Sequence, residues 1–329
     1  MKKRIFVLLV MVLVCSMLFA NGEKEEGSKV YELKLGHCGA PTHHYQTILT
    51  EFVEDVKEKT NGGLIISVFP SDQLGNQMES TQGVMIGTQD MVLNSDMVLS
   101  NWIPEFGILN LPYLFKDNAH MREVLDGPIG DEFSALVVPQ GAINLAFFDN
   151  GFRDITNSKK PINTPEDLEG MKIRVPEGSI YLQTFKALGA LPTVISFGEL
   201  YSALQLKTVD GQENPPAHVI TQKFYEVQKY IAKTNHIHSC SPLLINKKKF
   251  DALPEEYQQI LVSSAKEYAV KHTALIEDLE AEQWKEIEAN GMEITSPDPA
   301  PFAAKMTEVY AKAKEQFGAK LIDEILATK

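Results

Sequence analysis

The sequence predicts an α/β protein of two lobes, each an open and mostly parallel sheet with flanking helices, braced by a long helix near the C-terminus. Strand and helix patterns alternate as β-α-β-α-β from residue 30 to residue 93, and the pattern restarts near residue 142. Helical periodicity then runs unbroken from Glu255 to Asn290. The length of 329 residues also corresponds to about two domains at ~150 residues each.

The first 22 residues are predicted to be a signal peptide. Three cations at positions 2–4 precede the apolar run Ile5–Ala20, which is shorter than the ~20 residues that span a bilayer. An N-terminal membrane anchor and a lipid attached to Cys15 are the alternatives, although Val14 stands where a lipidation signal has a small residue. No other stretch approaches a membrane span. We therefore expect an exported, periplasmic protein without stable membrane insertion.

The mature chain is strongly acidic. Cleavage after residue 22 leaves 28 Lys and Arg against 44 Asp and Glu, a net charge of −16. This balance argues against nucleic acid and against anionic lipid as the main partner. A hydrophobic content of 44% and a charged content of 23% are ordinary for a globular protein and exclude a disordered chain.

The first lobe begins with a strand that alternates apolar and polar residues, followed by a helix that the Asn61-Gly62 pair ends. Pro70 ends the second strand, and the third strand is short and wholly apolar. The elements expected in order are a strand at 30–35, a helix at 47–59, a strand at 64–69, a helix at 77–87 and a strand at 91–93.

The second half contains weaker patterns and one strong one. We expect strands at 142–148 and 171–175, helices at 180–189 and 201–207, and the long helix at 255–290. At ~1.5 Å per residue this last helix reaches ~50 Å, enough to brace more than one lobe. The predicted division places residues 23–149 and 240–275 in lobe I, and residues 150–239 and 276–329 in lobe II.

Signatures of catalysis are absent from the sequence: it contains no G-x-S-x-G, H-E-x-x-H, P-loop or G-x-G-x-x-G. His236 and His238 would face one side of a strand and could hold a metal, but no third ligand accompanies them. We predict no metal and no cofactor. Cys38 and Cys240 are expected to be buried thiols, with a disulfide in an oxidising compartment as the alternative.

Three short segments carry polar residues suited to a carboxylate: 149–158 (DNGFRDITNS), 170–176 (GMKIRVP) and 209–215 (VDGQENP). Arg153 and Arg174 would emerge at the carboxyl ends of two strands, where open α/β sheets collect their ligands. A guanidinium offers paired donors to both oxygens of a carboxylate and stays charged. With an Asn amide, the two arginines predict a carboxylate clamp.

Together with residues 70–75 (PSDQLG), 109–115 (LNLPYLF) and 221–230 (TQKFYEVQKY), these segments resemble the solute-binding proteins of tripartite ATP-independent periplasmic (TRAP) transporters, of the dicarboxylate-binding-protein type. The resemblance runs in order from about residue 30 to 325. It implies a periplasmic-binding-protein-like, type II-like fold and a binding function without catalysis. Its expected partners are a small organic acid and the small and large membrane subunits of an ion-driven permease, and the protein itself is expected to be a monomer.

The resemblance also implies roles for residues. Arg174 would pair with the substrate carboxylate, Arg153 would support it, Asn214 would complete the clamp and Phe197 would pack on the ligand. Further polar candidates face the clamp or flank it: His37, His44, Gln77, Asn94 and Ser95 on the opposing lobe, and Glu177 on the clamp side.

The predicted substrate is an acid sugar, with a hexuronate favoured. Sialic acid and C4-dicarboxylates are the alternatives, because the stretch 209–236 is most similar to sialic-acid binders while Cys38, Ser95 and Val98 do not suit that bulky polar ligand. Two other function classes remain open at this point: an exported enzyme acting on acidic sugars, and a binding protein for an ATP-driven importer or a sensor.

Overall fold

A computed structural model describes residues 29–329; the predicted signal peptide and Cys15 lie outside the described residues. The described chain forms one mixed sheet with strands in the order β2-β1-β3-β8-β4-β7-β5-β6, and β9 pairs with β8. The strands are β1 (Tyr31–His37), β2 (Leu64–Phe69), β3 (Met91–Leu93), β4 (Ala142–Asn157), β5 (Lys172–Val175), β6 (Leu191–Val194), β7 (Gly211–Asn214), β8 (Tyr230–Asn246) and β9 (Glu293–Thr295).

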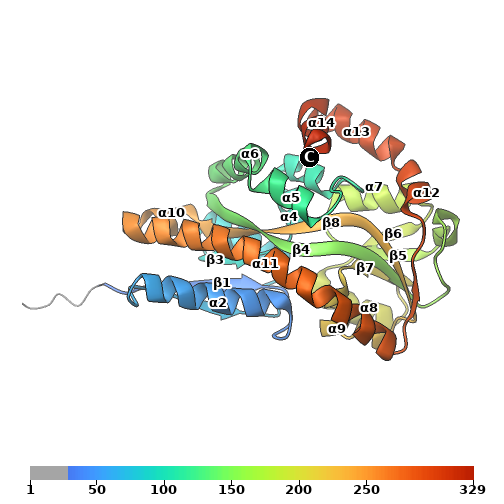
Figure 1. Ribbon diagram of the computed structural model, residues 1–329, viewed down its shortest axis with the longest axis horizontal. Coiled ribbons are helices and arrows are strands. Elements are labelled where there is room, and N and C mark those ends of the chain that lie inside the picture. The colour runs from blue at the N-terminus through green and yellow to red at the C-terminus, as the bar shows by residue number, and fades with distance from the viewer. Residues whose placement is uncertain (1–28) are drawn as a thin grey trace, which may run out of the picture.

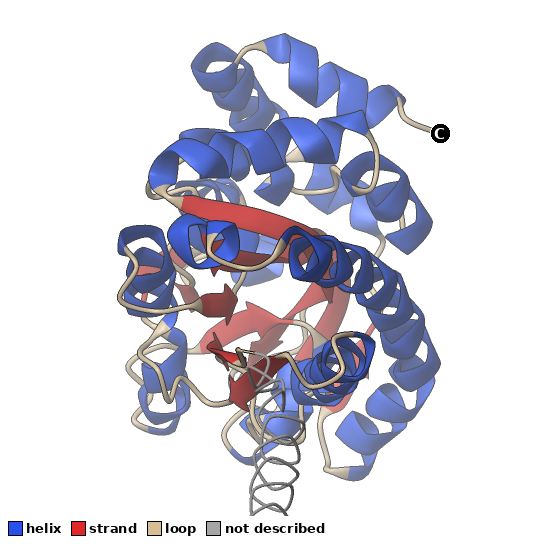
Figure 2. Ribbon diagram, turned by 90° about the vertical axis from the view of Figure 1, so that its left-hand side faces the viewer, coloured by secondary structure: helices blue, strands red, loops and turns tan. Residues whose placement is uncertain are grey.

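Helices lie on both faces of this sheet (Figure 2). The α-helices are α2 (His44–Lys59), α3 (Gln77–Ile86), α4 (Asp96–Leu99), α5 (Asn118–Leu125), α6 (Pro128–Val137), α7 (Ser179–Ala187), α8 (Leu200–Gln205), α9 (Pro216–Thr221), α10 (Lys247–Asp251), α11 (Glu255–Ala289), α12 (Pro299–Ala304), α13 (Thr307–Phe317) and α14 (Ala319–Ala327). Short 3₁₀ turns, among them η4 (Phe197–Glu199), connect some of them.

Two long antiparallel strands join the two halves of the sheet. On one side β2, β1 and β3 are parallel, and on the other β7, β5 and β6 are parallel. Between them β4 and β8 run the width of the molecule (Figure 1) and pair with each other from Ala142–Asn246 to Asn157–Tyr230. The predicted α/β class, with parallel strands in each half, is confirmed.

The strand expected at 142–148 was too short, and the strand β8 was not expected at all. β4 continues to Asn157, so Arg153 lies within a strand and not beyond its end. The reason is chemical: the second half of β4 and the middle of β8 contain many buried polar side chains, which pair with each other and with β7. Both strands cross the predicted lobe boundaries at 149/150 and 239/240.

The long C-terminal helix is present as α11 and packs against both halves of the chain. Glu255 and Glu256 occupy its first turn, where negative charge complements the helix dipole. Leu261 and Ala265 join the core formed by β1 and α2, whereas Ile287 joins a separate core around α8 and η5 (Phe224–Glu226). In Figure 1 this helix runs diagonally across the molecule, and it packs against α2, β4 and α9.

Cys38 and Cys240 are both buried free thiols. Cys240 Sγ donates to the carboxylate of Asp96 at 3.1 Å, and burial raises the pKa of both thiols above the ordinary value. None of the helices between residues 29 and 329 combines the length and apolar character needed to cross a bilayer.

Candidate functional site

The residues of the predicted clamp line a small, tightly closed cavity of about 10 Å³. Its walls come from β1, α2, α3 and α4 on one side and from β4, β5, β7, η4 and α9 on the other. The lining residues are Cys38, Tyr45, Gln77, Ser95, Met97, Asn150, Arg153, Arg174, Phe197, Asn214 and His218. The structure thus brings six predicted site residues together: Arg174, Arg153, Asn214, Phe197, Gln77 and Ser95.

Arg153 is buried and already paired inside the protein. Its Nε and one terminal nitrogen donate to the two carboxylate oxygens of Glu213 at 2.5 and 2.8 Å, and the same terminal nitrogen donates to the Glu213 carbonyl oxygen at 2.8 Å. Burial alone would raise the pKa of Glu213, but the charge and hydrogen bonds of Arg153 outweigh it and lower the pKa. The pair is therefore ionised, and the charge of Arg153 is neutralised locally.

Arg174, near the end of β5, has no such partner. Its Nε donates to the carbonyl oxygen of Ile195 at 2.7 Å, and no carboxylate of residues 29–329 lies within ion-pair distance of its guanidinium. The side chain is only 1% exposed, and burial lowers its pKa to about 10. Arg174 is still a cation at neutral pH. A buried cation without a counterion is costly, so the geometry and charge of this position suit an anion.

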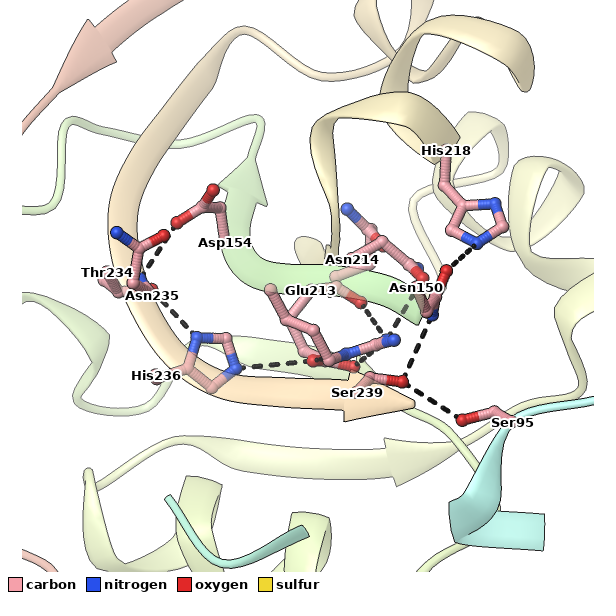
Figure 3. Close-up of polar contacts among 12 residues, drawn as sticks. Ser95, Asn150, Asp154, Glu213, Asn214, His218, Thr234, Asn235, His236 and Ser239 are labelled. Carbon is pink, nitrogen blue, oxygen red and sulfur yellow. Dashed lines mark hydrogen bonds and ion pairs between the residues drawn. The ribbon is translucent and has the colours of Figure 1, made fainter. Parts of the chain in front are cut away.

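A chain of hydrogen bonds connects the two walls of the cavity (Figure 3). Ser95 Oγ lies 3.2 Å from Ser239 Oγ, and Asn150 Nδ2 donates to the same Ser239 oxygen at 3.1 Å. The Asn150 amide oxygen in turn lies 3.1 Å from His218 Nε2. This chain holds two side chains that line the cavity, Asn150 and His218, in fixed orientations.

Asn214 is held from both ends of its amide. Its Oδ1 accepts from Arg153 at 3.1 Å, and its Nδ2 donates to Gln212 Oε1 at 2.5 Å. The second N–H of the Asn214 amide remains available to a ligand in the cavity. On the opposite wall, the side-chain oxygen of Gln77 is buried without a hydrogen-bond partner among the described residues, so it offers an acceptor.

Four predicted site residues do not line the cavity. His44 Nδ1 lies 2.7 Å from His272 Nε2, away from the clamp. Asn94 donates to the backbone oxygen of Gln77 and so anchors the first turn of α3. His37 Nε2 is engaged with Gln46 at 3.0 Å, and burial lowers its pKa to about 4. Glu177 lies outside the set of lining residues, although its charge helps raise the pKa of Asp72.

Sequence reasoning missed several lining residues, chiefly Asn150, His218 and Tyr45. Asn150 stands only three positions before Arg153 on β4, so its place in the same motif could have indicated it. His218 lies one helical turn after Asn214, on α9, but a lone histidine carries no signal by itself. Tyr45 is positioned by its 2.6 Å hydrogen bond to Ser241, a long-range contact that no local pattern reveals.

The His236 and His238 pair is used for other contacts. His236 Nε2 lies 3.3 Å from Glu213, and His238 Nε2 lies 3.1 Å from Asp149. Within the described part of the chain, no group of three or more His, Cys, Asp or Glu side chains is arranged to hold a metal ion.

A larger groove lies on the other face of β4. Phe152 and Asp154 flank Arg153 in sequence and point to this groove, as alternation along a strand requires. Its two lysines are engaged elsewhere: Lys116 donates to Thr328, and Lys233 lies over the Trp284 ring at 3.8 Å. The groove therefore lacks the unpaired buried cation that distinguishes the small cavity.

Comparison with known proteins gives a consistent picture. The model of the family "bacterial extracellular solute-binding protein, family 7" matches residues 35–316. A solute-binding protein of Verminephrobacter eiseniae is 36% identical over 89% of this chain and 88% of its own length. The 2,3-diketo-L-gulonate-binding periplasmic protein of Escherichia coli is 39% identical over 71% of this chain and 72% of its own length.

Solved structures of similar proteins share this fold over about nine-tenths of the chain. A TRAP periplasmic solute-binding protein from a Polaromonas species, bound to D-erythronate, has a TM-score of 0.89 and 36% identity, covering 91% of this chain and 99% of that one. A TRAP protein from Roseobacter denitrificans with bound β-D-glucuronate has a TM-score of 0.86 and 30% identity, covering 91% of this chain and 100% of that one.

Proposed function

The chain belongs to the family 7 bacterial extracellular solute-binding proteins, and from this membership we propose that it captures a monocarboxylate acid sugar in the small cavity and delivers it to a TRAP permease. Members of this group bind small organic acids and work with membrane permease subunits. In this proposal the chain is a periplasmic binding protein that acts as a monomer and carries out no chemistry on its ligand.

The observation that carries this proposal is the unequal state of the two arginines. Glu213 neutralises Arg153, whereas Arg174 is buried with no carboxylate partner among the described residues. All other side chains that line the cavity are uncharged at neutral pH, since burial lowers the pKa of His218 to about 3. The cavity therefore carries one uncompensated positive charge, which matches one carboxylate. The second carboxylate of a C4-dicarboxylate would have no cation to pair with.

The rest of the cavity suits a hydroxylated ligand. Gln77 and Asn214 each present an amide to it, and Phe197 contributes an apolar face. Hydroxyl groups that satisfy buried polar atoms give strong discrimination, because an analogue without them leaves those atoms unpaired. We favour a hexuronate or a related acid sugar, in line with the glucuronate and erythronate of the structural relatives. Sialic acid and C4-dicarboxylates rank below it.

Ligand entry requires the two lobes to separate, because Arg174 is 1% exposed in the present arrangement. We retain the predicted division, with 23–149 and 240–275 in lobe I and 150–239 and 276–329 in lobe II, as part of the proposal. A ligand that contacts both walls stabilises the closed state over the open one, which is how binding is coupled to closure.

A thermal-shift screen tests the function directly. The mature protein, residues 23–329, is heated with uronates, aldonates, sialic acid, C4-dicarboxylates and 2-oxo acids. A ligand at 100 times its Kd adds ~2.7 kcal/mol to the stability of the folded state and raises the midpoint by several degrees. The proposal expects one class of hydroxylated monocarboxylates to give this shift and Arg174→Ala to abolish it.

Two results would count against the proposal. If no acid shifts the midpoint even after the protein has been unfolded and refolded to remove carried-over ligand, the cavity does not bind acids. If an acid sugar is instead consumed during long incubation, with a bell-shaped pH dependence of the rate, the protein is an enzyme.

A further inference from the structure

Two buried histidines from opposite lobes stack on each other beside the cavity. The ring centroids of His43, which caps α2, and His218, in α9, lie 4.2 Å apart with an angle of 24° between the ring planes. His43 is fully buried and His218 is 3% exposed. Gly39 makes room for this arrangement, since a Cβ at that position would lie 3.0 Å from His43 side-chain atoms. We call the pair His43–His218 the imidazole stack.

Hydrogen bonds fix both rings of the imidazole stack in a neutral form. The backbone N–H of Tyr45 donates to His43 Nδ1 at 3.2 Å, so this nitrogen carries no proton. Asn150 gives its Nδ2 hydrogen to Ser239 and therefore presents its oxygen to His218 Nε2, which must carry the proton of that ring. With these proton positions, each ring has one nitrogen that could take up a second proton, and in both His43 and His218 this nitrogen is Nδ1.

Protonation of either ring conflicts with the closed arrangement. A proton on His43 Nδ1 would remove the acceptor that caps α2, and a proton on His218 Nδ1 would create a buried N–H without an acceptor among the described residues. Burial is the largest influence and lowers the pKa of both rings. The charged and titratable groups around the stack are mostly cations or other imidazoles: Arg153, Arg174, Glu213, His37, His44 and His272.

We propose that the imidazole stack forms only while both rings are neutral, so that closure of the lobes on a ligand releases protons in mildly acidic solution. This inference rests on the proposed function, because it requires lobes that open and close. It makes His43 a positioning residue: it contacts His218, which lines the cavity, and not the cavity itself.

The direction of the pH effect follows from the stack. Opening the lobes separates the rings and exposes them to water, where a histidine titrates near pH 6.5. The closed state has lower pKa values, so acid favours the open state and weakens ligand binding as the pH falls below that range. At pH 5.5 each ring that must lose its proton weakens binding by about tenfold relative to pH 7.5.

The carboxyl group of Asp72 acts in the opposite direction. The pKa of Asp72 is raised to about 6 by burial and by the charges of Glu177 and Glu79. Its protonation in acid relieves repulsion and favours closure. The pH dependence of ligand binding in the wild-type protein is therefore the sum of both effects. The contribution of the imidazole stack is the difference in pH dependence between wild type and a variant that lacks the stack.

The experiment compares the Kd at pH 5.5 and pH 7.5 for wild type, His43→Asn and His120→Gln. The probe is D-glucuronate, L-galactonate or D-erythronate, whichever binds in the screen at pH 7.5. Asparagine keeps a side-chain oxygen for the cap of α2 but cannot titrate. His120 is a buried histidine of α5, bonded to Ile325, and serves as the matched control. We expect the ratio of the two Kd values to be about tenfold smaller in His43→Asn and unchanged in His120→Gln.

A second arm needs no ligand and separates this inference from the proposed function. Spin labels at the exposed positions Glu58→Cys and Gln205→Cys, one on each lobe, report the interlobe distance at the two pH values. Acid should shift the unliganded distribution toward longer distances in wild type and do so less in His43→Asn. If no acid binds in the screen, the proposed function is refuted, but the inference about the imidazole stack is still tested by the label distances. Equal pH dependence in wild type and His43→Asn, in Kd or in label distance, would overturn the role of the stack.

Discussion

At the scale of single residues, the site depends on two arginines that are equally buried and electrically different. Arg153 is satisfied by Glu213, Asn214 and a carbonyl oxygen, whereas Arg174 keeps its guanidinium free of any carboxylate in residues 29–329. The first arginine is thus part of the protein's framework, and in the proposed function the second one pairs with the ligand. Substitution of Arg174 should therefore mainly change ligand binding. Disruption of the Arg153–Glu213 pair should mainly change the stability of the fold.

For Arg174 we predict that Arg174→Ala binds the preferred acid roughly 10²–10⁴-fold more weakly, because the substitution leaves a buried carboxylate unpaired. Arg174→Lys should also bind poorly, because an ammonium cannot supply the paired donors of a guanidinium. Isothermal titration calorimetry of the acid found in the screen measures the effect. Lys172→Ala is the matched control, since Lys172 lies on the same strand with its side chain exposed. An alanine variant within threefold of wild type would contradict the role given to Arg174.

For Arg153 the prediction concerns its partner. Glu213→Gln leaves a buried guanidinium without its counterion and should lower the free energy of unfolding by about 3–5 kcal/mol near neutral pH. The pKa of Glu213 is lowered in the folded state. The ionised side chain therefore contributes its full stabilisation above the ordinary glutamate pKa of ~4.3, and this stabilisation is lost as the pH falls through the pKa of the folded state.

Urea unfolding at pH 7 and at pH 3.5 tests this stability prediction. The difference between Glu213→Gln and wild type should shrink at the lower pH, while the exposed Glu169→Gln should change neither value by more than ~0.5 kcal/mol. If the free energy of unfolding of Glu213→Gln is lower than that of wild type by the same amount at both pH values, the destabilisation comes from packing and not from the ion pair.

At the scale of secondary-structure elements, β8 contains a bulge that helps position the clamp. Arg153 pairs with Ile237 and Ile155 pairs with Ala232, so residues 233–236 of β8 lie opposite Asp154 alone. Asn235 adopts φ +42 there, and Asp154 accepts its backbone N–H at 3.0 Å. The same bulge places His236 against Glu213, as Figure 3 shows. Bulges near binding sites commonly re-aim side chains in this way.

We predict that Asp154→Asn increases stability at pH 8 relative to wild type by at least ~1 kcal/mol. Burial raises the pKa of Asp154 to about 7, against an ordinary value of ~3.9. The folded state therefore holds a proton that the unfolded state has lost, and stability falls as the pH rises from about 4 to 7. Asparagine stays neutral and can still accept the Asn235 N–H. Urea unfolding at pH 5 and pH 8 should show a smaller pH dependence in the variant; an equal dependence would refute the assignment.

The same elements show what could be predicted from sequence. The elements from β1 to β3 and the helix α11 were predicted because their apolar residues recur with strand or helix periods. The second half of β4 and all of β8 were not. In the second half of β4 and the middle of β8 many buried side chains are polar and are satisfied by other buried polar groups: Asp149 by His238, Arg153 by Glu213. Hydrophobic periodicity cannot detect a core of this kind. The apolar run 243–245 at the end of β8 could have indicated that strand. The resemblance to a known family supplied the clamp residues that periodicity could not.

At the scale of the whole molecule, Arg174 is only 1% exposed, so the proposed function requires the lobes to part before a ligand can enter. Gly198 in η4 and Asp72 after β2 approach each other from the two sides, and a Cβ at Gly198 would lie 3.8 Å from the Asp72 carboxylate. These two positions belong to different lobes in the proposed division. We therefore choose these two positions for a covalent lock across the cleft.

We predict that an Asp72→Cys/Gly198→Cys double variant, oxidised in the absence of ligand, binds the preferred acid at a rate at least ~10²-fold slower than wild type, because a disulfide between the lobes prevents the opening that entry requires. Stopped-flow fluorescence measures the association rate, and a reductant should restore it, since the native Cys38 and Cys240 are buried and free. The two single variants control for the substitutions themselves. Association at the wild-type rate in the fully oxidised double variant would mean that the ligand reaches Arg174 without separation of the lobes, and the closure mechanism would then have to be abandoned even if the clamp itself is correct.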